Sequence, residues 1–301
     1  MKQTVVNAGV AVADEVYFLP GALVPGEKHR AANVLRVIGG NGANAALAIA
    51  RLGGDARLLT RTGADAAGEA LRAGLAAESV DFSLSPPISG RTTSTSTIIV
   101  EPDGARTIVN HFDRDFPDRP EWLPTALPAG TGAVLGDVRW ETGTRQLFEL
   151  ANQKKMIAVF DGDRKPIDSM LITLSTHRVF SAQALREMTR TSDLAVALEC
   201  FAKGRDGYFG VTDGGHGVYS YENGNVVHYQ AFAVDVVDTL GAGDVWHGAF
   251  ALALAERQPL PEAIRFASAA AALKCARRGG GMGAPSRAEV ERMLGRPVTG
   301  S

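Results

Sequence analysis

The sequence has few cysteines and no long hydrophobic run, and both absences exclude classes of protein. Only Cys200 and Cys275 occur among the 301 residues, which is too few for a disulfide framework and lacks the spacing of a metal site. Both lie in Ala- and Leu-rich stretches that predict helices, where a buried small side chain is expected. No stretch reaches the roughly 18–20 continuous apolar residues that a membrane helix needs. These features predict a cytoplasmic protein without a membrane partner.

An excess of charge of one sign is also missing. The 31 Lys+Arg nearly balance the 33 Asp+Glu, for a formal net charge of −2. This balance argues against a nucleic-acid partner, although it leaves room for a local site that binds a small anion. The six histidines show no metal-ligand spacing, so no structural zinc is expected. The motif Gly-x-x-x-x-Gly-Lys-[Ser/Thr] is absent, which excludes a P-loop NTPase.

In the second half of the chain, apolar strand-like runs alternate with helical stretches. Strands are expected near 133–138, 156–161, 178–181 and 208–212, and helices near 142–153 and 194–203. This rhythm is typical of a mostly parallel, doubly wound sheet with helices on both faces. Further strands are expected at 4–12 and 57–62, a hairpin around 222–225, and helices at 43–52, 66–78, 243–256 and 261–277. No repeat or linker interrupts residues 1–301, which predicts one α/β domain.

Two extended regions differ in residue composition from these apolar strands. Residues 15–38 and 92–111 are rich in polar β-forming residues, which suit a buried parallel sheet poorly. We interpret them as a small exposed sheet attached to the main domain.

The segment Asp238–Asp244, with the sequence Asp-Thr-Leu-Gly-Ala-Gly-Asp, is the strongest chemical motif. It joins a strand-like run to a helix, where free backbone N–H groups and the helix dipole favour an anion such as a phosphate. A carboxylate among phosphate-binding amides is repelled by that anion, so Asp244 is interpreted as a general base. The alternative is an acid that only complements the helix dipole.

A second glycine-rich segment, Gly39–Asn44, precedes the helix at 43–52. Gly40, Gly42 and Ala45 match the dinucleotide fingerprint Gly-x-Gly-x-x-Ala, which is weak by itself. The segment is also compatible with a site for a polyhydroxylated substrate, or with a plain strand–helix turn.

Two further loops could contact a ligand. The segment Val211–Gly217 leaves a buried strand and could bind a nucleotide, or be an ordinary loop. The segment Lys274–Gly283 contains three consecutive glycines, and its carbonyl groups could surround a cation or a ribose, or simply be solvated.

The segments Gly39–Asn44 and Asp238–Asp244, about 200 residues apart, together resemble the two signatures of the ribokinase-like (PfkB) carbohydrate kinases. The resemblance spans essentially the whole chain. It implies a doubly wound α/β domain with a β-sheet lid, a sugar substrate, ATP, and a homodimer. It displaces the interpretation of Gly39–Asn44 as the dinucleotide-binding segment of a dehydrogenase.

The resemblance also implies roles for individual residues. Asp244 is then the base, and the amides of Gly241, Ala242 and Gly243 form the anion hole. The sugar ligands implied are Asp14, which lies at the end of the predicted first strand, and Gly39, Gly40, Asn41 and Asn44. The nucleotide ligands implied are Thr212, Gly214, Gly217 and Lys274. The carbonyl groups of Asp238 and Leu240 lie, with the loop 277–283, where some members hold a monovalent cation such as K⁺.

One departure from the family pattern concerns Mg²⁺. The family's Asn-x-x-Glu should fall near residues 181–188, but that segment has no Asn and its Glu187 is displaced. Asp161 and Asp163 are the substitute candidates for the metal site.

Several short segments resemble the sulfofructose kinase branch of the family. They are Gly26-Glu27-Lys28, Ile108-Val109-Asn110, Asp137-Val138-Arg139-Trp140, Asp161-Gly162-Asp163 and Lys274-Cys275. A sulfonate needs several hydrogen-bond donors, and Lys28, Asn110 and Arg139 would supply a point charge, an amide and a planar fork. Taken singly, Lys28 could be an exposed lid lysine and Arg139 a member of a surface ion pair.

The expected reaction is therefore transfer of the ATP phosphoryl group to the 1-hydroxyl of 6-deoxy-6-sulfofructose. The alternatives are a ribokinase or fructokinase that acts on an uncharged sugar, and a non-catalytic sugar or nucleotide sensor.

Overall fold

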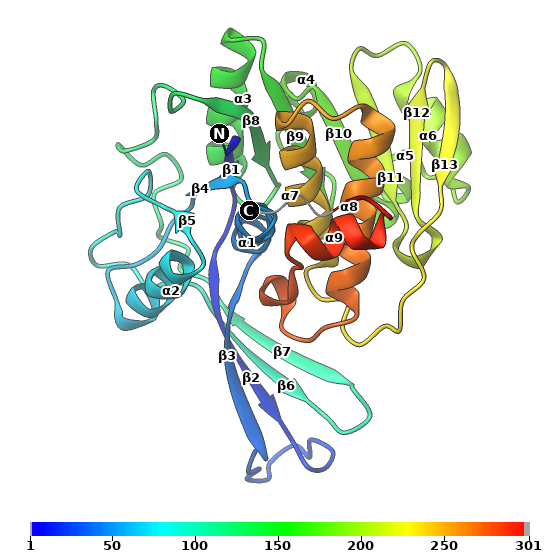
Figure 1. Ribbon diagram of the computed structural model, residues 1–301. Helices are drawn as coiled ribbons and strands as arrows, with labels where there is room; N and C mark the ends of the chain where they lie inside the picture. The colour runs from blue at the N-terminus through cyan, green and yellow to red at the C-terminus, as the bar shows by residue number, and fades with distance from the viewer. Residues whose placement is uncertain (1, 298–301) are drawn as a thin grey trace.

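The computed structural model describes residues 2–297, and their strands form two sheets (Figure 1). The larger sheet has nine strands in the order β13-β12-β11-β10-β9-β8-β1-β4-β5. Its strands are β1 (Thr4–Ala8), β4 (Asp55–Leu59), β5 (Val80–Asp81), β8 (Thr131–Gly136), β9 (Ile157–Gly162), β10 (His177–Ser181), β11 (Tyr208–Thr212), β12 (Val218–Glu222) and β13 (Asn225–Tyr229). All neighbouring pairs are parallel except β11–β12 and β12–β13.

Helices cover both faces of this sheet. One face packs against α1 (Asn41–Arg51), α2 (Ala66–Ala77), α7 (Ala242–Ala255), α8 (Leu260–Cys275) and α9 (Arg287–Met293). The other packs against α3 (Glu141–Gln153), α4 (Met170–Leu174), α5 (Ala182–Thr189) and α6 (Leu194–Ala202). Every residue of β1 is buried, as expected for a central parallel strand that is covered on both sides. The predicted doubly wound, mostly parallel α/β fold is confirmed.

The smaller sheet projects from one end of the helical body (Figure 1). It has the order β3-β2-β6-β7, from β2 (Val12–Phe18), β3 (Asn33–Gly39), β6 (Thr95–Val100) and β7 (Arg106–His111). β2 and β6 are parallel, whereas the two outer pairs are antiparallel. The two extended regions singled out in the sequence therefore supply the small separate sheet, which we call the lid.

The order of the strands places the site. The chain runs from β1 outward to β4 and β5, and then returns to β8 on the other side of β1. Ligands of open α/β sheets bind outside the carboxyl ends of the strands where the order reverses. Here the order reverses between β1 and β8, and the residues that directly follow these two strands are Gly9 and Asp137.

Some expectations for local structure were wrong. The single strand predicted over 4–12 is two strands, because the chain leaves the main sheet after Ala8 and enters the lid at Val12. Asp14 consequently lies within β2 of the lid and not at the end of the first strand. The short helices α5 and α9 were not predicted, because one or two turns carry little periodic signal. Cys200 is exposed on α6 and Cys275 is partly buried, so the expected full burial does not hold.

Candidate active site

The helix α7 begins at the motif that the sequence singled out. Gly241 precedes it in a left-handed conformation with φ of 76°, which glycine adopts without strain. Asp244 lies in the first turn, and its Oδ2 accepts a hydrogen bond of 2.7 Å from Asn44 Nδ2. Burial raises the pKa of the Asp244 carboxyl to about 6. A carboxylate whose pKa lies just below neutral pH is mostly ionised there and can take up a proton, which suits a general base.

Asn44 brings the two glycine-rich segments together. It is buried on α1, and its Oδ1 accepts a hydrogen bond of 3.1 Å from Gly281 N while its amide nitrogen donates to Asp244. A Cβ atom on Gly281 would lie 2.4 Å from Asn44 Oδ1, so only glycine permits this approach. Asn44 thus fixes the orientation of Asp244 relative to the loop after α8.

The register of the lid strands aligns polar side chains. Asp14 on β2 is paired with Ser96 on β6, and Ser96 with Asn110 on β7. Asn110 Nδ2 donates a 2.7 Å hydrogen bond to Ser96 Oγ. Burial raises the pKa of Asp14, which a hydrogen bond with Ser96 partly offsets, and Asp14 Oδ1 has no hydrogen-bond partner among the described residues. A Cβ atom on Gly39 would lie 1.9 Å from Asp14 Oδ2. Asp14 therefore has a buried acceptor available for a ligand hydroxyl.

Three further aspartates lie at the carboxyl ends of β8 and β9. Burial raises the pKa values of Asp137 and Asp161 well above the usual range, and the charges of Asp163 and Asp244 add to the rise. Asp163 pairs with Arg139 and accepts a 3.4 Å hydrogen bond from Asn41 Nδ2.

These carboxylates do not form a closed metal cage. Within residues 2–297, no group of three or more His, Cys, Asp and Glu side chains is arranged to hold a metal ion. Mg²⁺ is commonly held by one or two carboxylates together with substrate phosphates, and Asp161 and Asp163 fit that more open arrangement.

His247 is a site residue that the sequence reasoning missed. It is buried on α7, and its Nδ1 lies 2.8 Å from the carbonyl oxygen of Gly243 and 3.4 Å from Asp161 Oδ2. Burial lowers its pKa, which favours the neutral imidazole. Its position three residues after Asp244, on the same helix face, was the available signal.

A cavity of about 580 Å³ adjoins the start of α7. Its lining includes five predicted residues, namely Thr212, Gly214, Gly217, Ala242 and Gly243. Most of the remaining wall is apolar and comes from Val218, the segment 231–236 and helix α8. The cavity therefore lies between the predicted nucleotide loop and the predicted anion hole, and we call it the nucleotide-loop cavity.

Two predicted ligands lie apart from this cluster or in a different role. Lys28 is exposed in the loop between β2 and β3, with no ion pair among the described residues. Lys274 is fully buried and does not line the nucleotide-loop cavity, and its ammonium group donates to the carbonyl oxygen of Asp238 instead. Leu240 donates its backbone N–H to Asp238 Oδ1, and this bond leaves the prediction for its carbonyl group untested.

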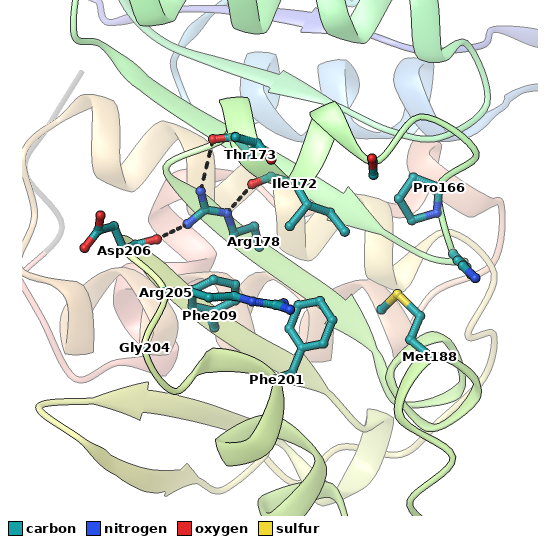
Figure 2. Close-up of a pocket in the computed structure, with 12 residues that line it drawn as sticks. Pro166, Ile172, Thr173, Arg178, Met188, Phe201, Gly204, Arg205, Asp206 and Phe209 are labelled. Atoms are coloured by element: carbon teal, nitrogen blue, oxygen red, sulfur yellow. Dashed lines mark hydrogen bonds between the residues drawn. The ribbon is translucent and has the colours of Figure 1, made fainter.

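A second cavity, of about 680 Å³, lies on the face of the sheet that α3 to α6 cover (Figure 2). None of the predicted site residues lines it. Its buried Arg178 donates to the carbonyl oxygens of Ile172, Thr173 and Asp206. These bonds join α4 to the segment before β11, which is a structural role.

Comparisons with known proteins agree with the fold and with the resemblance to the family. The model of the pfkB family of carbohydrate kinases matches residues 5–287. A ribokinase of Haemophilus influenzae is 28% identical over 308 residues, which cover 98% of this chain and 99% of that protein. The aminoimidazole riboside kinase of Salmonella typhimurium is 27% identical over 85% of this chain and 86% of its own length.

Solved structures give the same picture. A protein of Agrobacterium tumefaciens, provisionally described as a ribokinase, superposes with a TM-score of 0.87 at 32% identity, over 99% of this chain and 100% of its own. The Arabidopsis thaliana ribokinase, solved with ribose and ATP, shares the fold with a TM-score of 0.84 at 24% identity, over 98% and 99% of the two chains. The chain belongs to the pfkB family of carbohydrate kinases.

Proposed function

We propose that the protein transfers the γ-phosphoryl group of ATP to a primary hydroxyl of a ketose. The observation that carries this proposal is Asp244, which is ionisable near neutral pH and lies at a glycine-lined helix start beside the nucleotide-loop cavity. Asp244 accepts the proton of the attacking hydroxyl, while the amides of Gly241 to Gly243 stabilise the charge of the migrating group. The lid covers the sugar and excludes water.

Asp161 and Asp163 are the residues that would hold Mg²⁺. When bound, Mg²⁺ neutralises charge on the phosphates of ATP. The high pKa values of the buried carboxylates around it are consistent with a site that gains from a cation.

For the substrate, we propose 6-deoxy-6-sulfofructose, phosphorylated at its 1-hydroxyl. Arg139 follows the carboxyl end of β8. Within residues 2–297 its guanidinium makes one hydrogen bond, in which Nη2 donates to Asp163. A guanidinium has five N–H donors, so most of them are available to a sulfonate. Asn110, in the polar row of the lid, and the exposed Lys28 would add an amide and a second charge.

An uncharged sugar is the second candidate. The relatives reported above are kinases of ribose and of a riboside, and Asp163 already neutralises part of the Arg139 charge. A fructokinase of Klebsiella pneumoniae also matches, at 28% identity over 71% of this chain and 75% of its own length.

A side-by-side assay of ADP formation tests both candidates. The sugars are sulfofructose, fructose, fructose 6-phosphate and ribose, each with wild-type protein, Lys28→Ala and Arg139→Ala. The exposed Lys203→Ala and Arg292→Ala are matched controls, since neither wild-type residue lines the cavity beside α7. A preference for sulfofructose that only the first two variants lose supports the proposal. Equal turnover of fructose, unaffected by these variants, refutes the sulfonate part. No ADP with any sugar would favour a non-catalytic sensor.

We also propose a homodimer formed through the lid. β7 is exposed along its whole length and carries Ile108 and Val109, which are 48% and 62% exposed. Apolar side chains on an open edge strand favour association. Light scattering after gel filtration should give twice the monomer mass, and the monomer mass for Val109→Asp. A monomeric wild-type protein refutes this proposal.

Location in the cell stays a prediction from the sequence. Within residues 2–297, no helix is both long and apolar enough to cross a membrane.

A further inference from the structure

Lys274 places a buried positive charge beneath the anion-binding turn. The residue lies near the end of α8 with none of its surface exposed. Its Nζ donates a hydrogen bond of 2.7 Å to the carbonyl oxygen of Asp238 and lies 3.4 Å from Asp238 Oδ2. A buried ammonium group is stable only when oxygen atoms surround and neutralise it, and here one residue supplies both a carbonyl and a carboxylate.

Asp238 passes this constraint on to the turn. Its Oδ1 accepts hydrogen bonds from Leu240 N, at 3.0 Å, and from Arg106 of the lid, at 3.1 Å. Its Oδ2 accepts one of 3.2 Å from Gly279 N. The residue after Leu240 is Gly241, the N-cap of α7. The ammonium group therefore holds Asp238, and the contacts of Asp238 fix where α7 begins and so where Asp244 lies.

The resemblance to the family implied a free monovalent cation at this point. The residues present do not fit one at Asp238. The Asp238 carbonyl oxygen already binds an ammonium group, and its carboxylate faces two cationic side chains, Lys274 and Arg106. A third positive charge at the same carboxylate would be repelled by both.

We propose that the Lys274 ammonium group is a tethered substitute for that cation, so the protein holds its anion-binding turn without K⁺. An ammonium group carries the same charge as K⁺ and has a similar size, and its attachment to α8 makes it permanent. Lys274 is then a positioning residue, since it acts on Asp244 through Asp238 and the turn. This inference rests on the proposed kinase function, but part of its test does not.

The first experiment uses the wild-type protein. Turnover of the best sugar is measured in chloride salts of K⁺, Na⁺ and tetramethylammonium at equal ionic strength, with Mg²⁺ constant. We expect rates that agree within about twofold, because no site has to be filled. A rate in K⁺ that is about tenfold or more above the rate in tetramethylammonium overturns the inference.

The second experiment removes the charge with Lys274→Met, and uses the exposed Lys203→Met as its control. We expect a fall in kcat of about tenfold or more, with KM for ATP changed less, because α7 loses its fixed start. K⁺ or methylammonium should restore part of this loss in the variant and change nothing in the control. A variant with wild-type kcat in tetramethylammonium refutes the positioning role.

The third experiment needs no activity. The melting temperature is followed against K⁺ concentration at constant ionic strength. We expect no K⁺-specific shift for the wild type and a rise for Lys274→Met, since an ion that binds only the folded state stabilises it. A K⁺-specific rise in the wild type overturns the inference. This measurement remains decisive even when none of the sugars gives ADP. If Lys274→Met does not fold, the two wild-type measurements decide.

Discussion

Replacement of Asp244 by asparagine removes the base while it keeps the size and shape of the side chain. The amide oxygen of the substituted side chain can still accept from Asn44 Nδ2, at the position where Asp244 Oδ2 now lies 2.7 Å away. We expect kcat to fall by about 10²–10⁴-fold, the usual contribution of a general base. This corresponds to about 3–5 kcal/mol in the activation barrier. KM for the sugar should change by less than about threefold, because the amide can still form a hydrogen bond with the sugar hydroxyl although it cannot take its proton.

The pH profile gives a second measurement of the same group. A base must be deprotonated to act, and burial places the pKa of Asp244 at about 6. Wild-type kcat/KM should therefore fall about tenfold per pH unit below pH 6. The residual activity of Asp244→Asn should lack this limb. An initial-rate assay between pH 5 and 9, with KM measured at each pH, separates the two proteins.

The same substitution should stabilise the fold at high pH. The raised pKa means that the folded state disfavours the charged carboxylate relative to the unfolded chain, whose value is near 3.8. The stability present below about pH 3.8 is therefore lost as the pH rises through 6. A difference of about two units corresponds to at most about 3 kcal/mol, less where solvent screens the group. Urea denaturation at pH 8 should show Asp244→Asn to be more stable than the wild type. Turnover within tenfold of wild type, with an unchanged acid limb, would refute the base role.

Three further substitutions test the sugar site, the nucleotide loop and the core. Gly39→Ala places a Cβ atom 1.9 Å from Asp14 Oδ2, so the carboxylate must move and sugar KM should rise by about tenfold or more, with a smaller change in KM for ATP. Gly217 has a φ of 96°, and Gly217→Ala would place a Cβ atom 2.1 Å from the Tyr229 carbonyl oxygen. Strain of about 1–3 kcal/mol should raise KM for ATP more than for the sugar, and equal rises would contradict the assignment. Phe250→Ala, in the fully buried core of α7, should cost about 3–5 kcal/mol in urea denaturation, and a loss below 1 kcal/mol would contradict its packing role.

Much of the fold could be predicted because hydrophobic periodicity is a local property. The alternation of strands and helices from residue 131 onward, and the polar texture of the lid strands, follow from which faces each element must bury. The break at Gly9–Ala11 could not be predicted in this way. Both flanking segments are extended and apolar enough to be one strand, and only their pairing with β4 and β8 on one side and β3 and β6 on the other separates them.

The candidate site divides in the same manner. Asp244 and its glycine-rich turn could be proposed as a site from the sequence, because a helix start that can hold an anion is encoded by neighbouring residues. An ion pair of Arg139 was one of the alternatives, but its partner Asp163 was not predicted, and neither were the roles of His247 and Asp137. These groups acquire their roles from neighbours that are distant along the chain.

The sequence by itself determined most of the strands and helices, the polar strands of the lid and the motifs that we propose for the chemistry, because propensity, periodicity and motif spacing act over a few residues. Only the tertiary structure decided that Asn44 orients Asp244 across 200 residues, and that the Lys274 ammonium group lies on the Asp238 carbonyl rather than on the nucleotide-loop cavity. The physical reason is that burial and the pairing of charges depend on which surfaces come together when the chain packs, and these interactions set the pKa and the orientation of each group.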